Sequence, residues 1–383
     1  MKTLKGITWD HPRGYQPLRA AVPLWKKTAA VGDLVWDVRS LKDFGDYPIE
    51  KLCEKYDLLL VDHPFMGEAA LTNILLPLDK HLSEEFIKKQ EQESIGKSFQ
   101  SYWYENHLWA LPIDAAAQVA AFRKDLLEHN QLNLPVTLDD MESMAEKLPG
   151  DKYIGIPLSP TDIWCTFLTL SAQYSRGTFF SENGINPVTG AQALQRIRTW
   201  IPFLHPESLD MNPIHMLDFM SEFDEVVYVP FIFSYSNYSR KAFPGKTVHF
   251  SNAPISEPSG ISTLLGGVGI AISAQSEHID EALSFIRFIL SENIQKRLYY
   301  REGGQPAHSS VWNDKRINDD CNNYFINIRQ TLDHAYVRPQ IKGFNRFQEQ
   351  AADLLNAAVR TDEQSGDIVE KINRLYQRIC GGN

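Results

Sequence analysis

Three short apolar segments alternate with helical segments at the start of the chain. Residues 34–38 and 58–61 are largely apolar runs of strand length, residues 4–9 are a further short predicted strand, and helical patterns occupy about 15–30 and 49–55. Alternation of this kind builds a mainly parallel sheet with helices on both faces. The pattern therefore predicts an α/β fold, in which ligands sit at the loops that follow the carboxyl ends of strands.

A second run of strands and helices begins after residue 112. Apolar segments at 118–122, 154–156 and 226–233 are predicted strands. Helical spacing predicts helices at 138–148, where Thr137 is the cap, and at 162–174, 189–200 and 211–223. A further strand is expected at 266–272, and helices dominate afterwards. The chain is thus expected to contain a second α/β unit.

Length and charge exclude several classes of protein. At roughly 100–200 residues per domain, 383 residues indicate two or three domains. The 38 Lys and Arg against 48 Asp and Glu give a net charge of −10, so a phosphate backbone or an anionic membrane would repel the chain on average. The longest apolar run, 226–233, is about eight residues, well short of the roughly 18 that a membrane helix requires. We expect neither a nucleic-acid partner nor a membrane span.

The motifs of common catalytic sites are missing from the sequence. It contains no Gly-x-Ser-x-Gly elbow and no phosphate-binding Gly-x-x-x-x-Gly-Lys loop. The eleven histidines lack short metal-binding spacings, and the four cysteines are too far apart for a zinc motif or a disulfide framework. We therefore expect no cofactor, no metal and cysteines that only pack.

Two loops after predicted strands share one pattern. Each strand is followed by Asp-His and then proline, and each loop also carries an aromatic residue. These loops supply the candidate ligand residues Trp9, Asp10, His11, Asp62, His63 and Phe65. If the strands are parallel, the two loops face one site. The alternative is that Asp and Pro merely form turns.

Aromatic rings and carboxylates add further candidates. The strand at 226–233 runs into Tyr235, Asn237 and Tyr238, whose rings, hydroxyls and amide suit a flat polyhydroxylated ligand. Asp62 and Asp114 could act as acid and base in a glycosidase, but carboxylates equally accept hydrogen bonds from sugar hydroxyls. Both interpretations stay open on the residues alone.

Several ordered motifs resemble the bacterial ABC-transporter solute-binding proteins of family 1, the group that includes maltose-binding protein. The matching segments are 56–62, 108–114 with 123–127, 264–273, 281–289 and 304–308. The first resembles the strand whose end supplies a ligand-binding carboxylate, and 108–114 and 264–273 resemble the family's crossovers. The loops at 7–11 and 62–65 look unlike the maltose-binding branch, which implies a distinct subgroup whose ligand need not be a maltodextrin.

The resemblance implies a two-lobed α/β fold of the periplasmic-binding-protein kind, with hinge crossovers and a ligand cleft between the lobes. Lobe one is expected at 1–112 plus 266–309, and lobe two at 113–265 plus 310–383. The implied function is non-catalytic: the lobes close around a small polar ligand, a sugar, sugar acid or similar compound, for uptake by an ABC permease. We expect a monomer. The alternatives are a cytoplasmic ligand sensor or carrier, and a two-carboxylate glycoside-processing enzyme.

The expected site combines the two loops with residues from later segments. Its members from later segments are Asp114, Trp164, Tyr235, Asn237, Tyr238, Gly267 and Arg338. Arg338 could clamp an anionic ligand, because guanidinium groups bind carboxylates in bidentate fashion. The alternative for Arg338 is a salt bridge at the surface or between lobes.

The first residues contain no apolar core and no small-residue cleavage site, so they do not predict a Sec signal peptide. We expect a cytoplasmic protein if Met1 is the native start. If the signal has been removed, we expect a periplasmic or extracellular one.

Overall fold

The chain divides into two units, each made of segments that are distant in the sequence. A computed structural model describes residues 3–28, 32–41, 43, 48–256 and 260–381. Unit 1 consists of Met1–Ala116, Gly266–Ile317 and Arg338–Asn345, and unit 2 of Ala117–Leu265, Asn318–Val337 and Arg346–Asn383. The lobe boundaries expected from the sequence stay a prediction, and their outermost residues, 1–2 and 382–383, lie outside the described part.

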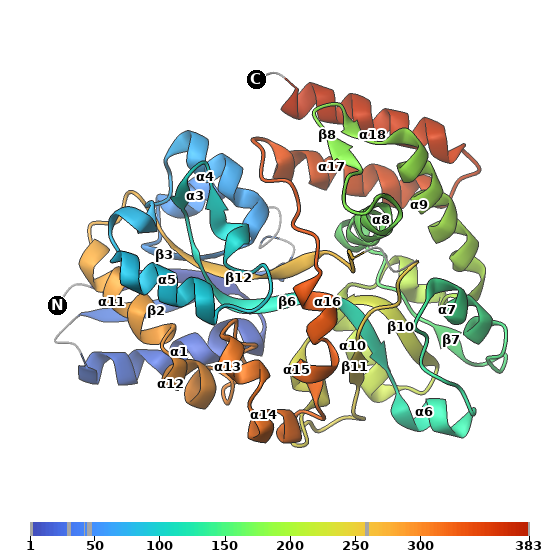
Figure 1. The fold of residues 1–383 in the computed structure, drawn as a ribbon, viewed down its shortest axis with the longest axis horizontal. Coiled ribbons are helices and arrows are strands. Elements are labelled where there is room, and N and C mark those ends of the chain that lie inside the picture. The colour runs from blue at the N-terminus through green and yellow to red at the C-terminus, as the bar shows by residue number, and fades with distance from the viewer. Residues whose placement is uncertain (1–2, 29–31, 42, 44–47, 257–259, 382–383) are drawn as a thin grey trace. The chain divides into compact units, whose positions relative to one another are not determined.

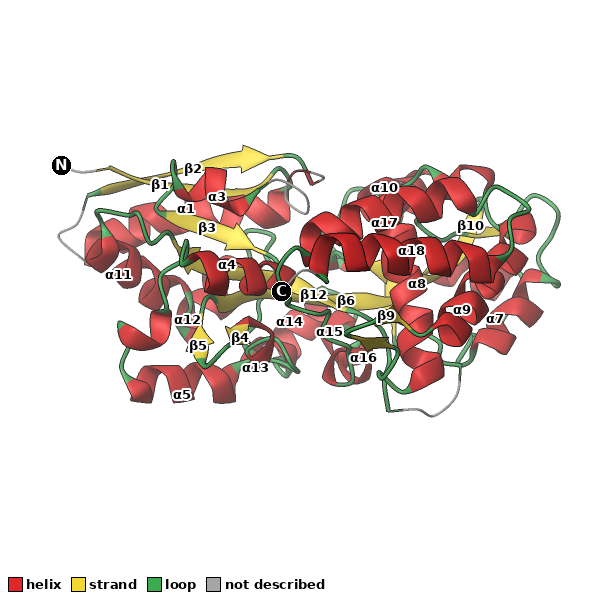
Figure 2. Cartoon of the chain, turned by 90° about the horizontal axis from the view of Figure 1, so that it is seen from above, coloured by secondary structure: helices red, strands yellow, loops and turns green. Residues whose placement is uncertain are grey.

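Unit 1 is built on a sheet with the strand order β2-β1-β3-β12. Its strands are β1 (Thr3–Trp9), β2 (Asp33–Arg39), β3 (Leu58–Val61) and β12 (Leu265–Ile272). The first three are parallel, as the alternating pattern predicts, and Figure 2 shows their arrows pointing the same way. β12 runs antiparallel to β3, so the sheet of unit 1 is mixed, with three parallel strands and one antiparallel strand. No single crossover helix links β3 to β12, and only such a connection would favour the parallel direction.

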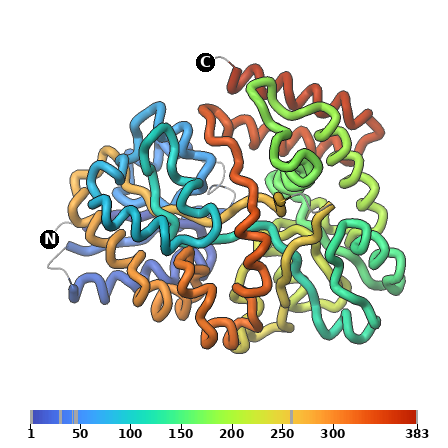
Figure 3. Tube along the Cα trace, viewed as in Figure 1, coloured from blue at the N-terminus to red at the C-terminus, as the bar shows by residue number. Residues whose placement is uncertain are grey.

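Helices of unit 1 carry its apolar core. They are α1 (Pro12–Thr28), α3 (Ile49–Cys53), α4 (Met66–Thr72), α5 (Glu84–Glu93), α11 (Ile279–Ile289), α12 (Glu292–Ile294) and α13 (Ser309–Trp312). Helix α1 buries Leu18, Val22 and Trp25 along one face, and Trp25 meets Phe285 of α11 edge-on at 5.4 Å between ring centroids. The late segment of α11 thus packs beside the first helix, as the orange and blue tubes of Figure 3 show. Residues 29 and 30, the expected end of the first helix, lie outside the described residues.

Unit 2 contains the second part of β6 (Leu111–Phe122), a strand that begins in unit 1, together with β10 (Val226–Phe233), β7 (Tyr153–Ile154) and β11 (His249–Ser251). β10 is antiparallel to β6 and parallel to β7, and β11 is antiparallel to β6. The strand predicted at 226–233 is confirmed. The strand predicted at 118–122 is the end of the longer β6.

Helices of unit 2 include the two last helices of the chain. They are α6 (Lys124–His129), α7 (Leu138–Ala145), α8 (Pro160–Ser175), α9 (Pro187–Trp200), α10 (Pro213–Glu222), α15 (Tyr324–Asn327), α16 (Arg329–Asp333), α17 (Phe344–Ala358, whose first residues belong to unit 1) and α18 (Ser365–Cys380). Thr137 caps α7 through a capping box with Asp140, as predicted. In Figure 1 the red α18 lies beside the green α9, and the two helices are in contact.

Three features of the described residues concern membrane spans, metal ligands and cysteines. No helix among them is both long and apolar enough to cross a membrane. No group of three or more His, Cys, Asp or Glu side chains there is arranged to hold a metal ion. The four cysteines are free thiols and all are buried.

Candidate functional site

A row of polar residues begins where the parallel strands β1 and β3 end. Ile7 of β1 lies opposite Leu59 of β3, so Asp10 and Asp62, which follow the two strands, come at the same level. Parallel strands present their carboxyl ends at one edge of a sheet, which is where α/β folds place ligands. The prediction that these two loops belong together therefore has a direct basis in the register.

The row continues through β12 to β6. Val61 pairs with Gly269, and because β12 is antiparallel to β3, Gly267 comes level with the residues just after Val61. Gly267 has a φ of 101°, and a Cβ placed on it would lie 2.5 Å from the backbone oxygen of Asp114. Only glycine fits this position, because both the backbone conformation and the close approach exclude a side chain. The missing side chain of Gly267 thus allows the backbone of Asp114 to lie directly beside β12, which makes Asp114 the last member of the row.

Asp62 is held from three directions. Its Oδ1 accepts a hydrogen bond from the backbone amide of His63 at 2.8 Å and lies 3.1 Å from His63 Nδ1. Its Oδ2 forms an ion pair with the Arg338 guanidinium. The side chain of Asp62 is 17% exposed and that of Arg338 is 5% exposed, so the pair lies near the surface but is largely shielded from water.

Both titratable groups beside Arg338 have shifted pKa values. Burial by itself would raise the pKa of Asp62, but the Arg338 charge and His63 hold it well below its usual range. Burial lowers the pKa of His63, although Asp62 opposes that shift. The amide of Arg338 donates to His63 Nε2 at 3.2 Å, which requires an unprotonated Nε2. At neutral pH Asp62 is therefore ionised, and His63 is neutral with its proton on Nδ1.

The short segment Arg338–Asn345 is fixed to the rest of unit 1 by further contacts besides this ion pair. Gln340 donates through its side-chain amide to the backbone oxygens of His63, at 3.2 Å, and of Ser101. A Cβ on Gly67 would lie 1.7 Å from the Gln340 oxygen, so only a glycine in α4 permits this approach. Arg338 is consequently held in place by contacts within unit 1.

Asp114 forms the second ion pair of the row. Arg13, in the first turn of α1, donates from Nε to Oδ2 at 2.9 Å and from Nη2 to Oδ1 at 2.5 Å. The two side chains are 5% and 0% exposed. This is a buried bidentate pair, the strongest geometry for arginine and carboxylate.

Tyr102 lies between the two pairs. Its hydroxyl donates to the Val61 backbone oxygen at 3.4 Å, and its ring fills the space beside Gly269. Burial, and then the charges of Asp62 and Asp114, raise the pKa of Tyr102 well above its usual value, so it stays neutral. Its pKa responds to both carboxylates because the row brings them close to one phenol.

The remaining predicted residues of unit 1 lie at different depths. Trp9 and Phe65 are each only 3% exposed and pack in the core, whereas Asp10 is exposed. His11 accepts a hydrogen bond on Nδ1 from the Arg13 amide at 3.0 Å. Burial and the Arg13 charge lower the pKa of His11 to about 4, so it too is neutral at physiological pH.

Three of the four predicted residues of unit 2 lie together at one 3₁₀ turn, where the Tyr238 amide donates to the Tyr235 backbone oxygen at 3.2 Å, and the fourth, Trp164, lies in α8. Trp164 is 1% exposed in α8 and stacks on Phe167 at 5.6 Å between centroids. The Tyr238 hydroxyl donates to Asp218 at 2.6 Å. Asn237 lies on the same 3₁₀ turn as Tyr238, just after the buried Tyr235, and its buried Oδ1 accepts no hydrogen bond. Their role in ligand binding stays a prediction.

Three residues that contact the row or its ion pairs were not predicted from the sequence: Arg13, Tyr102 and Gln340. Arg13 follows His11 by two positions and starts a helix, so its place in the first loop was a usable signal. Tyr102 and Gln340 lie in irregular segments, and no local pattern pointed to them.

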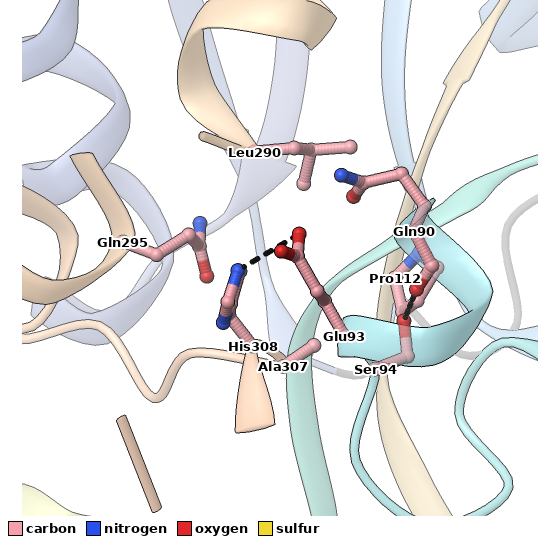
Figure 4. A pocket seen from close by; sticks show the side chains of 8 residues that line it. All are labelled: Gln90, Glu93, Ser94, Pro112, Leu290, Gln295, Ala307 and His308. Atoms are coloured by element: carbon pink, nitrogen blue, oxygen red, sulfur yellow. Dashed lines mark hydrogen bonds and ion pairs between the residues drawn. The ribbon is translucent and has the colours of Figure 1, made fainter. Parts of the chain in front are cut away.

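A separate hollow of about 190 Å³, including its opening to solvent, lies elsewhere in unit 1. Figure 4 shows its lining, which consists of Gln90, Glu93, Ser94, Pro112, Leu290, Gln295, Ala307 and His308. The His308 ring faces the Glu93 carboxylate, with Nε2 and Oε2 3.1 Å apart. None of the thirteen predicted site residues is among the residues that line it, so this hollow is not the predicted site.

Solved structures of solute-binding proteins have the same fold. T. maritima MalE3 with bound maltose superposes with a TM-score of 0.83 at 17% identity, covering 97% of this chain and 98% of that one. A solute-binding protein from Agrobacterium radiobacter K84, in complex with ribitol, gives 0.82 at 18% identity, with 98% of both chains covered. One from Thermotoga lettingae TMO, with α-D-tagatose, gives 0.82 at 16% identity over 98% of this chain and 100% of that chain. These likenesses confirm the predicted fold class.

Sequence relatives cover part of the chain. A maltotriose-binding protein of Pyrococcus abyssi (strain GE5 / Orsay) is 23% identical in an alignment 303 positions long that covers 74% of this chain and 61% of the relative. A probable ABC transporter-binding protein of Deinococcus radiodurans is 21% identical in an alignment 268 positions long that covers 66% of this chain and 63% of the relative. The matches thus span less than two thirds of the length of these relatives.

The family model of bacterial extracellular solute-binding proteins matches residues 54–296. The match confirms the resemblance on the motifs, and it is the reason to class the chain with binding proteins rather than with enzymes. The chain belongs to the family of bacterial extracellular solute-binding proteins.

Proposed function

We propose that the chain captures a small polar ligand, a carbohydrate or sugar derivative, for ABC-type uptake, and that its two units close on that ligand. The observation that carries this proposal is the row Asp10, Asp62, Gly267 and Asp114 at the carboxyl ends of β1 and β3. A carboxylate has about four lone-pair positions, so Asp62 can still accept hydrogen bonds from hydroxyl groups while it pairs with Arg338.

The comparisons support the same ligand class. The relatives and structures above are described as binding maltotriose, maltose, ribitol or tagatose, all of which carry several hydroxyl groups. An ABC permease as partner and a monomeric state are proposed together with this function. A place of action outside the cytoplasm is proposed too, and the description of the family as extracellular supports it.

A thermal-shift screen of sugars, sugar acids, polyols and small organic acids tests the proposal. A ligand at about 100 times its dissociation constant adds roughly 2.7 kcal/mol to the free energy of unfolding, which such a screen detects readily. We expect stabilisation by at least one polyhydroxylated compound. If no compound stabilises the protein, the proposal is wrong.

Two variants place the ligand. We expect Asp62→Ala and Tyr235→Ala to lose the ligand-dependent shift, which is measured for each variant relative to its own melting temperature without ligand. Asp79→Ala is the matched control, because Asp79 contacts His107 on another loop of unit 1. Full ligand-dependent stabilisation in both site variants would remove Asp62 and Tyr235 from the binding site.

The two alternative functions have distinct readouts. A glycoside-processing enzyme would turn over a chromogenic glycoside and would lose that turnover when Asp62 or Asp114 is replaced. A cytoplasmic sensor or carrier would co-purify with a soluble partner. Family membership favours the binding function over both.

A further inference from the structure

We propose that the row selects its ligand by charge: it binds an uncharged polyhydroxyl compound and rejects the corresponding sugar acid and amino sugar, and the Asp62–Arg338 pair sets this preference. The inference rests on the proposed function and adds the charge class of the ligand and the residues that determine it.

Two of the three carboxylates of the row are neutralised by an arginine. Arg338 neutralises Asp62, and Arg13 neutralises Asp114 through two hydrogen bonds. Asp10 is exposed to solvent, and its backbone amide donates to the Arg39 backbone oxygen at 2.7 Å. Asp62 and Asp114 thus each have an arginine beside them, and a charged ligand finds no uncompensated opposite charge at these two carboxylates.

Arg338 is not available to an anionic ligand. Its Nη2 is paired with Asp62, its side chain is 5% exposed, and its backbone amide is bound to His63. A ligand carboxylate would have to take the guanidinium away from Asp62 and leave that carboxylate ionised and shielded from water. Breaking a buried pair in this way is strongly unfavourable.

Asp62 offers equally little to a cationic ligand. Oδ1 already accepts from the His63 amide at 2.8 Å and Oδ2 pairs with Arg338. An ammonium group brought to this point would approach the Arg338 guanidinium and meet a like charge. A hydroxyl carries no net charge to desolvate, and it can use a remaining lone pair of the carboxylate.

The Asp62→Asn variant tests the inference, because the amide oxygen can still accept from the His63 backbone while the Arg338 charge loses its partner. Isothermal titration calorimetry at pH 7 compares D-glucose with D-glucuronate and D-glucosamine, and ribitol with D-ribonate. For the wild type we expect each uncharged compound to bind at least tenfold more tightly than its charged counterparts. In Asp62→Asn we expect the affinity for the acid, relative to the uncharged compound, to rise about tenfold or more, as a newly available charge-assisted hydrogen bond allows.

Two further variants keep the test decisive. Asp79→Asn changes the net charge by the same amount and can still accept from the Leu108 amide, so it is expected to leave the preference unchanged. Arg338→Gln leaves Asp62 without its cation and is expected to shift the preference toward D-glucosamine. Circular dichroism establishes that each variant is folded, and if Asp62→Asn is not, Arg338→Gln alone decides.

The outcomes separate this inference from the function on which it rests. Equal binding of acid and uncharged compound by the wild type, or an unchanged ratio in a folded Asp62→Asn, overturns the inference but leaves a sugar-binding function intact. Failure of every compound to bind, both in this set and in the thermal-shift screen, overturns both.

Discussion

Replacing Asp114 by alanine removes the carboxylate from the buried pair with Arg13. The two side chains are 0% and 5% exposed and share two hydrogen bonds of 2.9 and 2.5 Å, so the guanidinium would keep its charge in a site shielded from water. Removing one partner of such a pair costs about 3–5 kcal/mol. For a unit of this size, each kcal/mol lowers the melting temperature by about 2–4 °C, so we expect a loss of roughly 6–20 °C.

Differential scanning calorimetry without ligand measures this loss, and urea unfolding followed by circular dichroism gives the free energy. Arg13→Ala is expected to destabilise by a similar amount. The double variant Arg13→Met with Asp114→Leu is the control, because replacing both charges by apolar side chains of similar size is often close to neutral. If each single variant lowers the free energy of unfolding by less than about 1 kcal/mol, the Arg13–Asp114 pair does not depend on both of its partners for stability, and the prediction is wrong.

Three further predictions concern other parts of the two units. Gly67→Ala should displace the segment Arg338–Asn345, because the new Cβ would lie 1.7 Å from the Gln340 backbone oxygen. We expect faster amide hydrogen exchange in that segment. Unchanged exchange would contradict this prediction. Burial raises the pKa of Asp162 to about 7, although a hydrogen bond from Ser159 opposes that shift, so the stability that this carboxyl contributes is present below about pH 4 and is lost as the pH rises to 7. Relative to Asp162→Asn, the unfolding free energy of the wild type should fall by about 1.4 kcal/mol per pH unit between these values. Parallel pH profiles of the two proteins would refute this. The pKa of Asp62 is lowered instead, so the stability that Asp62 contributes is present above about pH 4 and should be lost as the pH falls further. The unfolding free energies of the wild type and of Asp62→Asn should therefore converge as the pH is lowered. A constant difference between them would contradict the ion pair.

Local patterns predicted most elements because their apolar periodicity is strong. β3 and β10 are continuous or nearly continuous apolar runs, and α7 has a capping box that is visible in the letters. The direction of β12 was beyond local reasoning, because a strand's partner and orientation depend on contacts distant in the sequence. The start of β6 was missed for a similar reason: Pro112 and Asp114 interrupt its apolar pattern, and pairing with Gln305 and Ala307 supplies the backbone hydrogen bonds.

The site shows the same division. The loops after β1 and β3 were predicted from strand ends followed by Asp-His, and the register places them level. The partner of each carboxylate was not predicted, since Arg13 and Asp114 are 101 residues apart and Asp62 and Arg338 are 276 apart. Such pairings are properties of the folded chain. They also change how the carboxylates are understood, from isolated ligand acceptors to members of two neutral pairs.

A crystal structure with the most stabilising compound from the screen shows directly whether the ligand binds at the row. We expect ligand hydroxyls within hydrogen-bond distance of the Asp62 carboxylate, with the Arg338 and Arg13 ion pairs intact. A ligand bound in the hollow between Glu93 and His308, or at a place that touches no residue of the row, would contradict it.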